Sequence, residues 1–132
     1  MSADVVEGFT GTYHQDLHDV VEIMIAKAAR HERFLEEDSA FHTGILRTIG
    51  NVVAEQMVSA LWLVHMVVIP DLNDRDSDGF IVTAAAHKEI LVAAEAGELK
   101  AYRKAVRAHY RPLERILEQM DSEAQLRSSE AN

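Results

Sequence analysis

Residues 84–110 read AAAHKEILVAAEAGELKAYRKAVRAHY, and this stretch predicts a helical hairpin. On both sides of Gly97, apolar residues recur at steps of three and four, which is the spacing of amphipathic helices. Glycine readily adopts the left-handed conformation with which many helices end, so Gly97 marks the turn. We expect one helix over about residues 79–96 and a second over about residues 99–121.

Two histidines occupy matching levels in this hairpin. His87 lies ten residues before Gly97, and His109 lies twelve residues after it. At a rise of about 1.5 Å per residue, both lie roughly 15–18 Å from the turn, so antiparallel packing brings them to one level. Imidazoles that face a core lose hydration and need a partner. A metal ion is one such partner, because neutral imidazole nitrogens are common metal ligands.

A second pair of polar residues lies upstream. Asp38 and His42 are four residues apart on a predicted helix, so they share one face. Such a pair is also typical of a simple hydrogen bond between neighbouring turns. Together with His87 and His109 it makes a set of three imidazoles and one carboxylate, which suits Zn, Ni, Co, Mn or Fe(II). Spacing alone leaves both a metal site and a polar core network open.

The remaining apolar patterns are helical as well. They predict helices over residues 13–27, over residues 32–49, where Gly50 and Asn51 give a stop signal, and over residues 51–68. The helix over residues 51–68 is apolar on most sides, so we expect it to lie at the centre of the fold. No alternation typical of strands occurs anywhere, and the predicted fold class is therefore all-α, with about five helices.

Length and composition bound the possible functions. The 132 residues fit one domain, which we place at residues 13–121, between a flexible lead-in (1–12) and a loose polar tail (122–132). The net charge of -9 repels phosphate backbones, so we expect no direct nucleic-acid binding by this chain. The absence of cysteine excludes disulfides and thiolate sites, and it fits a cytoplasmic location. The apolar run over residues 60–70 is too short to span a membrane.

Four short motifs resemble one known family. They are EDSAFH at residues 37–42, Gly50-Asn51, the segment from AHKEI at residues 86–90 to Ala96-Gly97-Glu98, and AVRAHY at residues 105–110. In this order and at this spacing they resemble the FCD domain, the C-terminal effector-binding domain of FadR-subfamily GntR transcription regulators. The resemblance covers about residues 16–117.

The resemblance implies an antiparallel helical bundle around a central cavity. It implies a divalent metal ion, Zn or Ni foremost with Mn, Co or Fe as alternatives, held by Asp38, His42, His87 and His109. It also implies a small organic acid as effector, which would bind beside the metal and alter DNA binding by an attached winged helix-turn-helix. This sequence shows no such segment before the domain, so we expect the chain to lack its own DNA-binding part. A homodimer is expected.

The effector pocket is predicted less directly. By helix face alone, Ser59, Trp62, His65 and Met66 are candidate lining residues. The family has an arginine in its first helix that pairs with the ligand carboxylate, and no arginine occurs before Arg30 here. Anion binding would then fall to the metal or to another cation such as Arg47.

Two other functions remain open at this point. One is a small metal-dependent enzyme, for which no general base stands out, so we predict no catalytic residues and no enzyme activity. The other is a metal-free helical module that serves in dimerisation. Residues 74–81 match the first half of an EF-hand loop, but Ala85 stands where the last calcium ligand belongs, so we interpret them as an acidic loop.

Overall fold

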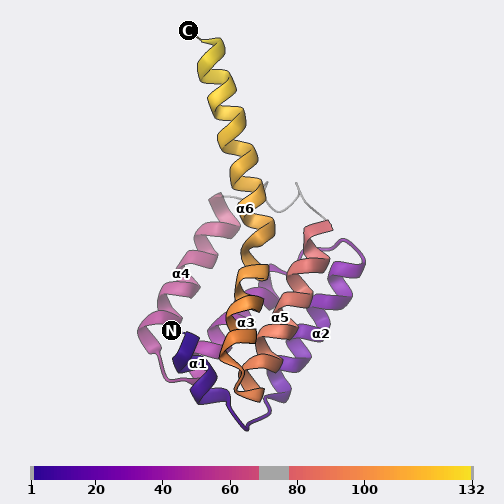
Figure 1. The fold of residues 1–132 in the computed structure, drawn as a ribbon, viewed down its shortest axis with the longest axis vertical. Coiled ribbons are helices and arrows are strands. Elements are labelled where there is room, and N and C mark those ends of the chain that lie inside the picture. The colour runs from indigo at the N-terminus through magenta and orange to yellow at the C-terminus, as the bar shows by residue number, and fades with distance from the viewer. Residues whose placement is uncertain (1, 69–77, 132) are drawn as a thin grey trace.

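The computed structural model describes residues 2–68 and 78–131. Within these ranges it describes every side chain except those of residues 64–68, 78 and 112–117. The described residues form six helices and no strand (Figure 1), which confirms the all-α prediction. The helices are α1 (Ser2–Phe9), α2 (Gln15–Ala29), α3 (Leu35–Thr48), α4 (Val52–Val68), α5 (Asp78–Ala96) and α6 (Leu99–Glu130). No helix in the described part is long and apolar enough to cross a membrane.

The core lies between α2, α3, α5 and the first half of α6. These helices turn their apolar faces toward one another, as their three- and four-residue spacing requires. The largest fully buried apolar side chains are Phe9, Phe41, Met24, Leu91, Val5 and Val21. Since α5 packs against both α2 and α6, and α2 also packs against α3, residues on α3, α5 and α6 can meet inside the bundle.

The predicted hairpin is present, with α5 and α6 side by side (Figure 1). Gly97 has φ +75°, the left-handed conformation expected at the end of a helix. Its N–H donates to the carbonyl of Ala94, and the N–H of Glu98 donates to the carbonyl of Ala93, so the last turn of α5 is closed. The hairpin therefore sets the heights of His87 and His109 as the sequence predicted.

Replacing Gly97 with alanine is expected to destabilise the domain by about 1–2 kcal/mol, because a side chain at positive φ is strained. A Cβ at this position would also lie 3.0 Å from the hydroxyl of Thr10. Gly11 provides a matched control, since it has φ +77° but a Cβ added there would meet no heavy atom within 4 Å. Urea denaturation should show a larger loss for Gly97→Ala than for Gly11→Ala, and equal losses would contradict the contact with Thr10.

The first twelve residues differ from the expected lead-in. Residues 2–9 form α1, which buries Val5, Val6 and Phe9 against the bundle. The connection to α2 is held at the end of α5, where the carboxylate of Glu95 accepts the backbone N–H of His14 at 2.7 Å. The same carboxylate lies 2.6 Å from Nε2 of His18. Glycines and hydroxyl residues around positions 8–12 suggested a frayed lead-in, but the segment before them is a short helix with three buried apolar residues.

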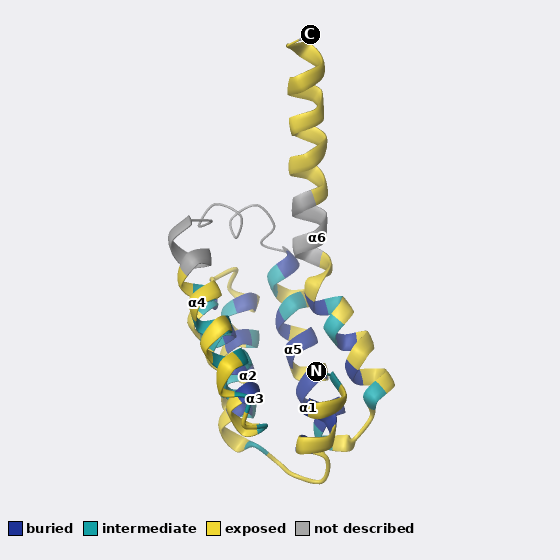
Figure 2. Ribbon diagram, turned by 90° about the vertical axis from the view of Figure 1, so that its left-hand side faces the viewer, coloured by how far each residue is buried: buried dark blue, intermediate teal, exposed yellow. Residues whose placement is uncertain are grey.

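The helix α4 also differs from its prediction. A helix that is apolar on most sides was expected at the centre, yet α4 lies at the edge of the molecule (Figure 2) and packs mainly against α3. None of its described side chains, over residues 52–63, is buried. An apolar pattern predicts that a helix face is buried against another surface, but it does not predict which surface that is.

The C-terminal tail is helical where a loose segment was expected. The helix α6 continues to Glu130 and projects away from the bundle (Figure 1), and residues 118–131 are exposed (Figure 2). This segment consists mainly of good helix formers and has few apolar residues, so its exposure follows from composition. The first half of the EF-hand-like segment, residues 74–77, lies outside the described residues.

Candidate metal centre

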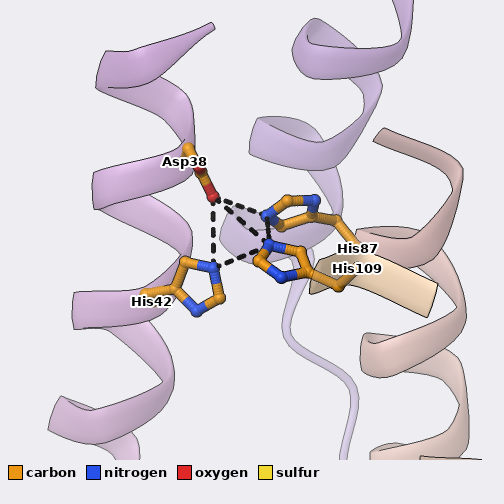
Figure 3. A group of neighbouring side chains, drawn as sticks. All are labelled: Asp38, His42, His87 and His109. Atoms are coloured by element: carbon orange, nitrogen blue, oxygen red, sulfur yellow. Dashed lines mark hydrogen bonds and ion pairs between the residues drawn. The ribbon is translucent and has the colours of Figure 1, made fainter. Parts of the chain in front are cut away.

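Three helices bring the four predicted ligands together (Figure 3). Asp38 and His42 lie on successive turns of α3, His87 lies on α5, and His109 lies on α6. One ligand atom from each residue lies within 4.8 Å of all the others. Three of the residues, Asp38, His87 and His109, are buried, and His42 is partly exposed. The sequence predicted the two pairs from spacing, and the fold joins them.

The contacts within this cluster are short. Oδ1 of Asp38 lies 2.6 Å from Nε2 of His87, 3.1 Å from Nε2 of His42 and 3.9 Å from Nε2 of His109. Nε2 of His109 lies 3.1 Å from Nε2 of His87 and 3.3 Å from Nε2 of His42. Three Nε2 atoms and one carboxylate oxygen therefore point at one shared position, as Figure 3 shows.

The position of the proton on the His87 ring shows whether a cation fits this position. Nδ1 of His87 lies 2.7 Å from the carbonyl oxygen of Thr83, one turn earlier on α5. A carbonyl only accepts, so this ring nitrogen donates its proton. In neutral His87, Nε2 then carries a lone pair, and this lone pair faces a carboxylate oxygen and a second imidazole nitrogen. Converging acceptors repel one another unless a proton or a metal ion lies between them, so the residues fit a bound cation.

The electrostatics of the cluster favour the protonation states that metal ligands need. Burial by itself would raise the pKa of Asp38, but the neighbouring imidazoles of His109, His42 and His87 hold this pKa well below its usual value. Burial lowers the pKa of His109 below 6.5, and the Asp38 carboxylate offsets only part of this effect. Asp38 is therefore an anion and His109 is neutral at pH 7, which are the states that bind metals.

The surroundings are apolar on one side and more open on the other. The ring of His87 has edge-to-face contacts with Phe41 and Phe34, with centroids 5.0 and 6.3 Å away. On the opposite side, 23% of the His42 side chain is exposed, and its ring centroid lies 6.2 Å from that of Trp62 on α4. The partly exposed edge of the cluster is therefore at His42.

The predicted pocket residues are placed unevenly. Trp62 lies near the cluster, and Ser59 is partly buried and donates its hydroxyl to the carbonyl of Glu55. Arg47 lies on the outer surface with 73% of its side chain exposed, and its guanidinium binds the Glu55 carboxylate at 2.7 and 3.0 Å. This placement does not favour a role for Arg47 in anion binding at the cluster. The side chains of His65 and Met66 lie outside the described residues.

One residue of the site could not be found from its side-chain type. Thr83 fixes the orientation of His87 through its backbone carbonyl, which any residue at this position would supply. The position could have been found only from the rule that a metal-binding histidine usually donates its second ring nitrogen to a carbonyl or carboxylate.

Comparison with known families identifies an FCD domain over residues 3–112, which is most of the chain. The chain belongs to the FCD domain family. The match begins inside α1, so this FCD domain starts earlier than the motifs alone indicated. A protein from Micromonospora viridifaciens named as a transcriptional regulatory protein, NedR, is 34% identical over 101 residues, which cover 76% of this chain and 72% of the relative. No solved structure gives a significant match.

Proposed function

We propose that this FCD domain is the effector-binding domain of a transcription regulator, and that it holds a divalent metal ion through Asp38, His42, His87 and His109. The observation that carries the proposal is the convergence of four ligand atoms at one largely buried position. The family and the name of the relative support a regulator rather than an enzyme.

The ligand set narrows the choice of metal. Three imidazole nitrogens and one carboxylate oxygen are borderline ligands, which favour Zn and Ni and also accept Mn, Co or Fe(II). A divalent ion with one carboxylate ligand keeps a net positive charge. When bound, the ion would supply this charge and open coordination positions for a carboxylate of the effector.

The effector would be a small organic acid that binds beside the metal. Its route passes the partly exposed His42 and the ring of Trp62, which would pack against the apolar part of the molecule. Because Arg47 is exposed and paired with Glu55, the positive charge for an anion would come mainly from the metal. Effector binding should therefore depend on metal.

A thermal-shift experiment tests this dependence. The domain is loaded with zinc or nickel, or treated with EDTA, and each form is screened with acetate, lactate, malonate, citrate and gluconate. At least one acid should raise the Tm of a metal-loaded form and leave the EDTA-treated form unchanged. Equal shifts in both forms would contradict binding at the metal, and no metal in the purified or reconstituted protein would contradict the centre itself.

Two alternatives are less well supported by the geometry. A metal-dependent enzyme needs a general base that is not a ligand. The nearest acidic residue in sequence, Glu37, forms an ion pair with Lys27 on α2. A metal-free dimerisation module would leave the converging acceptors of the cluster without a role, and metal analysis distinguishes it from a sensor.

Further expectations about the cell biology belong to the same proposal. The regulator would act in the cytoplasm as a homodimer, and a part other than this acidic chain would contact DNA. A change at the effector site would then reach the part that binds DNA by shifting a balance between two conformations.

The affinity for metal is expected to fall as the pH is lowered. Ligation needs neutral imidazoles, so protons compete with the metal at low pH. Burial lowers the pKa of His109, so this ligand takes up a proton only at a lower pH than an ordinary histidine does. Zinc affinity measured by chelator competition should be high at pH 7.5. In more acidic solution, where the imidazole ligands take up protons, the affinity should fall roughly tenfold per pH unit for each proton displaced. A flat profile between pH 7.5 and 5 would contradict histidine ligation.

A further inference from the structure

The outward face of α6 carries a row of exposed cations that recur at steps of three and four residues. We call them the α6 basic stripe, and they are Lys100, Arg103, Lys104, Arg107 and Arg111. The opposite face of the same helix is buried and includes Tyr102, Ala105 and His109. At about 1.5 Å per residue, the stripe extends roughly 16 Å along the helix.

The cations of the stripe differ from the other described cations in having no anionic partner. Within the described part of the chain, none of the five forms an ion pair or a side-chain hydrogen bond. Outside the stripe, ion pairs with a glutamate are formed by Lys27, Arg30, Arg47, Lys88 and Arg127. Arg33 also takes part in an interaction. The fold therefore neutralises its scattered cations and leaves the stripe positive.

Neighbouring cations in the stripe repel one another. Three pairs are four residues apart, at positions 100 and 104, 103 and 107, and 107 and 111, so their side chains lie on successive turns. Like charges at this spacing destabilise a helix. The chain has 22 acidic residues, yet residues 99–111 contain none of them. A solvated helix face normally mixes charges of both signs, whereas this face would be relieved by an anionic partner.

The charge of the remaining chain limits the size of that partner. The chain carries -9 in total, of which the stripe contributes +5, so the other residues carry -14. Charges act over about 8 Å at physiological salt. A DNA duplex or an anionic membrane extends far beyond the stripe and would be repelled by the acidic surface around it. A short acidic segment can remain within the 16 Å of the stripe, at about 1.5 Å per residue of a helix.

The edge of the stripe allows a second helix to pack closely. Ala101 and Ala108 lie beside the cations and are seven residues apart, which is the repeat of paired helices. A shallow hollow of about 570 Å³ opens beside Ala101, and it is lined by Glu98, Leu99, Lys100, Ala101, Lys104 and Arg107. Apart from Glu98, this lining is apolar or positively charged. A helix whose acidic residues flank a small or apolar seam matches both features.

We propose that the α6 basic stripe binds an acidic helical segment of a partner protein. The carboxylates of the segment would lie on the cations, and its seam would lie along Ala101 and Ala108. The stripe is on the face of α6 opposite His109, so it is separate from the metal centre and adds a protein partner to the sensor function proposed above.

Fluorescence anisotropy with a designed peptide tests this surface. The probe is a labelled, alanine-based helical peptide whose glutamates follow one another at steps of four, three and four residues. Lys104→Glu reverses the charge at the middle of the stripe and should weaken binding at least about tenfold. Lys88→Glu is the matched control, because it makes the same change in net charge on α5, outside the stripe. This control should change the affinity by less than about twofold.

Thermal stability distinguishes a binding surface from a structural one. Lys104→Glu replaces repulsion from Lys100 and Arg107 by attraction, so its Tm should rise by about 1–4 °C while binding is lost. Lys88→Glu removes the ion pair with Glu22 and should give no such rise. The metal-induced shift in Tm should persist in Lys104→Glu, so failure of this surface and failure of the metal centre are distinguishable.

Three outcomes would overturn the proposal. The first is equal binding of the probe by the unmodified protein and by Lys104→Glu. The second is equal binding of a peptide in which the same glutamates are dispersed around the helix. The third is tighter binding of a short DNA duplex, or of vesicles that contain phosphatidylglycerol, than of the probe. This last outcome would assign the stripe to a nucleic acid or to a membrane.

Discussion

His87→Ala is expected to abolish the thermal stabilisation that zinc or nickel gives to the domain. His87 is fully buried, and its Nε2 lies closest to Asp38 among the three imidazoles, at 2.6 Å. Alanine removes a central ligand, and the other three hold the ion much more weakly. Because a metal that binds only the folded state stabilises it by mass action, the loss of binding appears directly as a loss of the metal-induced shift in Tm.

The expected effect is large. At a free metal concentration a thousand times the dissociation constant, binding contributes roughly 4 kcal/mol to the free energy of unfolding. For a domain of this size this corresponds to about 12–20 °C in Tm. Differential scanning fluorimetry measures the Tm of each variant with and without metal. The difference between these two Tm values excludes any effect of the substitution on the metal-free protein.

His14→Ala is the control for this experiment. His14 lies at the start of α2, outside the cluster, and its backbone N–H contact with Glu95 does not need the ring. This variant should keep the full metal-induced shift. A shift of normal size in His87→Ala, or an equal loss in both variants, would show that the metal binds elsewhere.

Phe9→Ala is expected to destabilise the domain by about 3–5 kcal/mol, which is the usual cost of removing a fully buried aromatic ring. Phe9 is 0% exposed at the end of α1, and its ring centroid lies 4.3 Å from that of His14. The helix α1 packs against α3, α5 and α6, so the cavity would open into the core of the bundle. Urea denaturation followed by circular dichroism measures the loss.

Ile23→Ala serves as a comparison, because Ile23 is a large apolar residue on α2 that is 48% exposed. Its loss should stay below about 1 kcal/mol. If Phe9→Ala lost no more than Ile23→Ala, α1 would not be part of the folded domain. Residues 1–12 would then be the flexible lead-in that the sequence suggested.

The hairpin and the clustering of Asp38, His42, His87 and His109 could be predicted from the sequence, for physical reasons that can be named. Gly97 fixed the turn, and the constant rise of a helix then set the heights of His87 and His109. Asp38 and His42 followed from one turn of helix. What spacing could not supply was the packing of α3 against the hairpin, since contacts between distant segments depend on the whole core. The family resemblance supplied this step, and the structure and the family match agree with it.

Other parts of the fold could not be read from local patterns. The helix α1 is only eight residues long, and short helices owe their stability to packing rather than to their own sequence. The edge position of α4 follows from its packing mainly against α3 among the described helices. No residue pattern within α4 predicts this packing. Arg47 was named as a possible cation for the anion, and in the structure its exposed guanidinium pairs with Glu55 on α4, which its position in the sequence does not predict.

The spacing of the ligands along the chain has a consequence for folding. Asp38 and His87 are 49 residues apart, His87 and His109 are 22 apart, and His42 and His109 are 67 apart. An ion bound to all four would close loops of these lengths, and so would restrict the unfolded chain as a cross-link does. In a protein without cysteine this cross-link would be reversible. The metal supply of the cell would then add to the stability of the folded domain, in addition to its readiness to bind an effector.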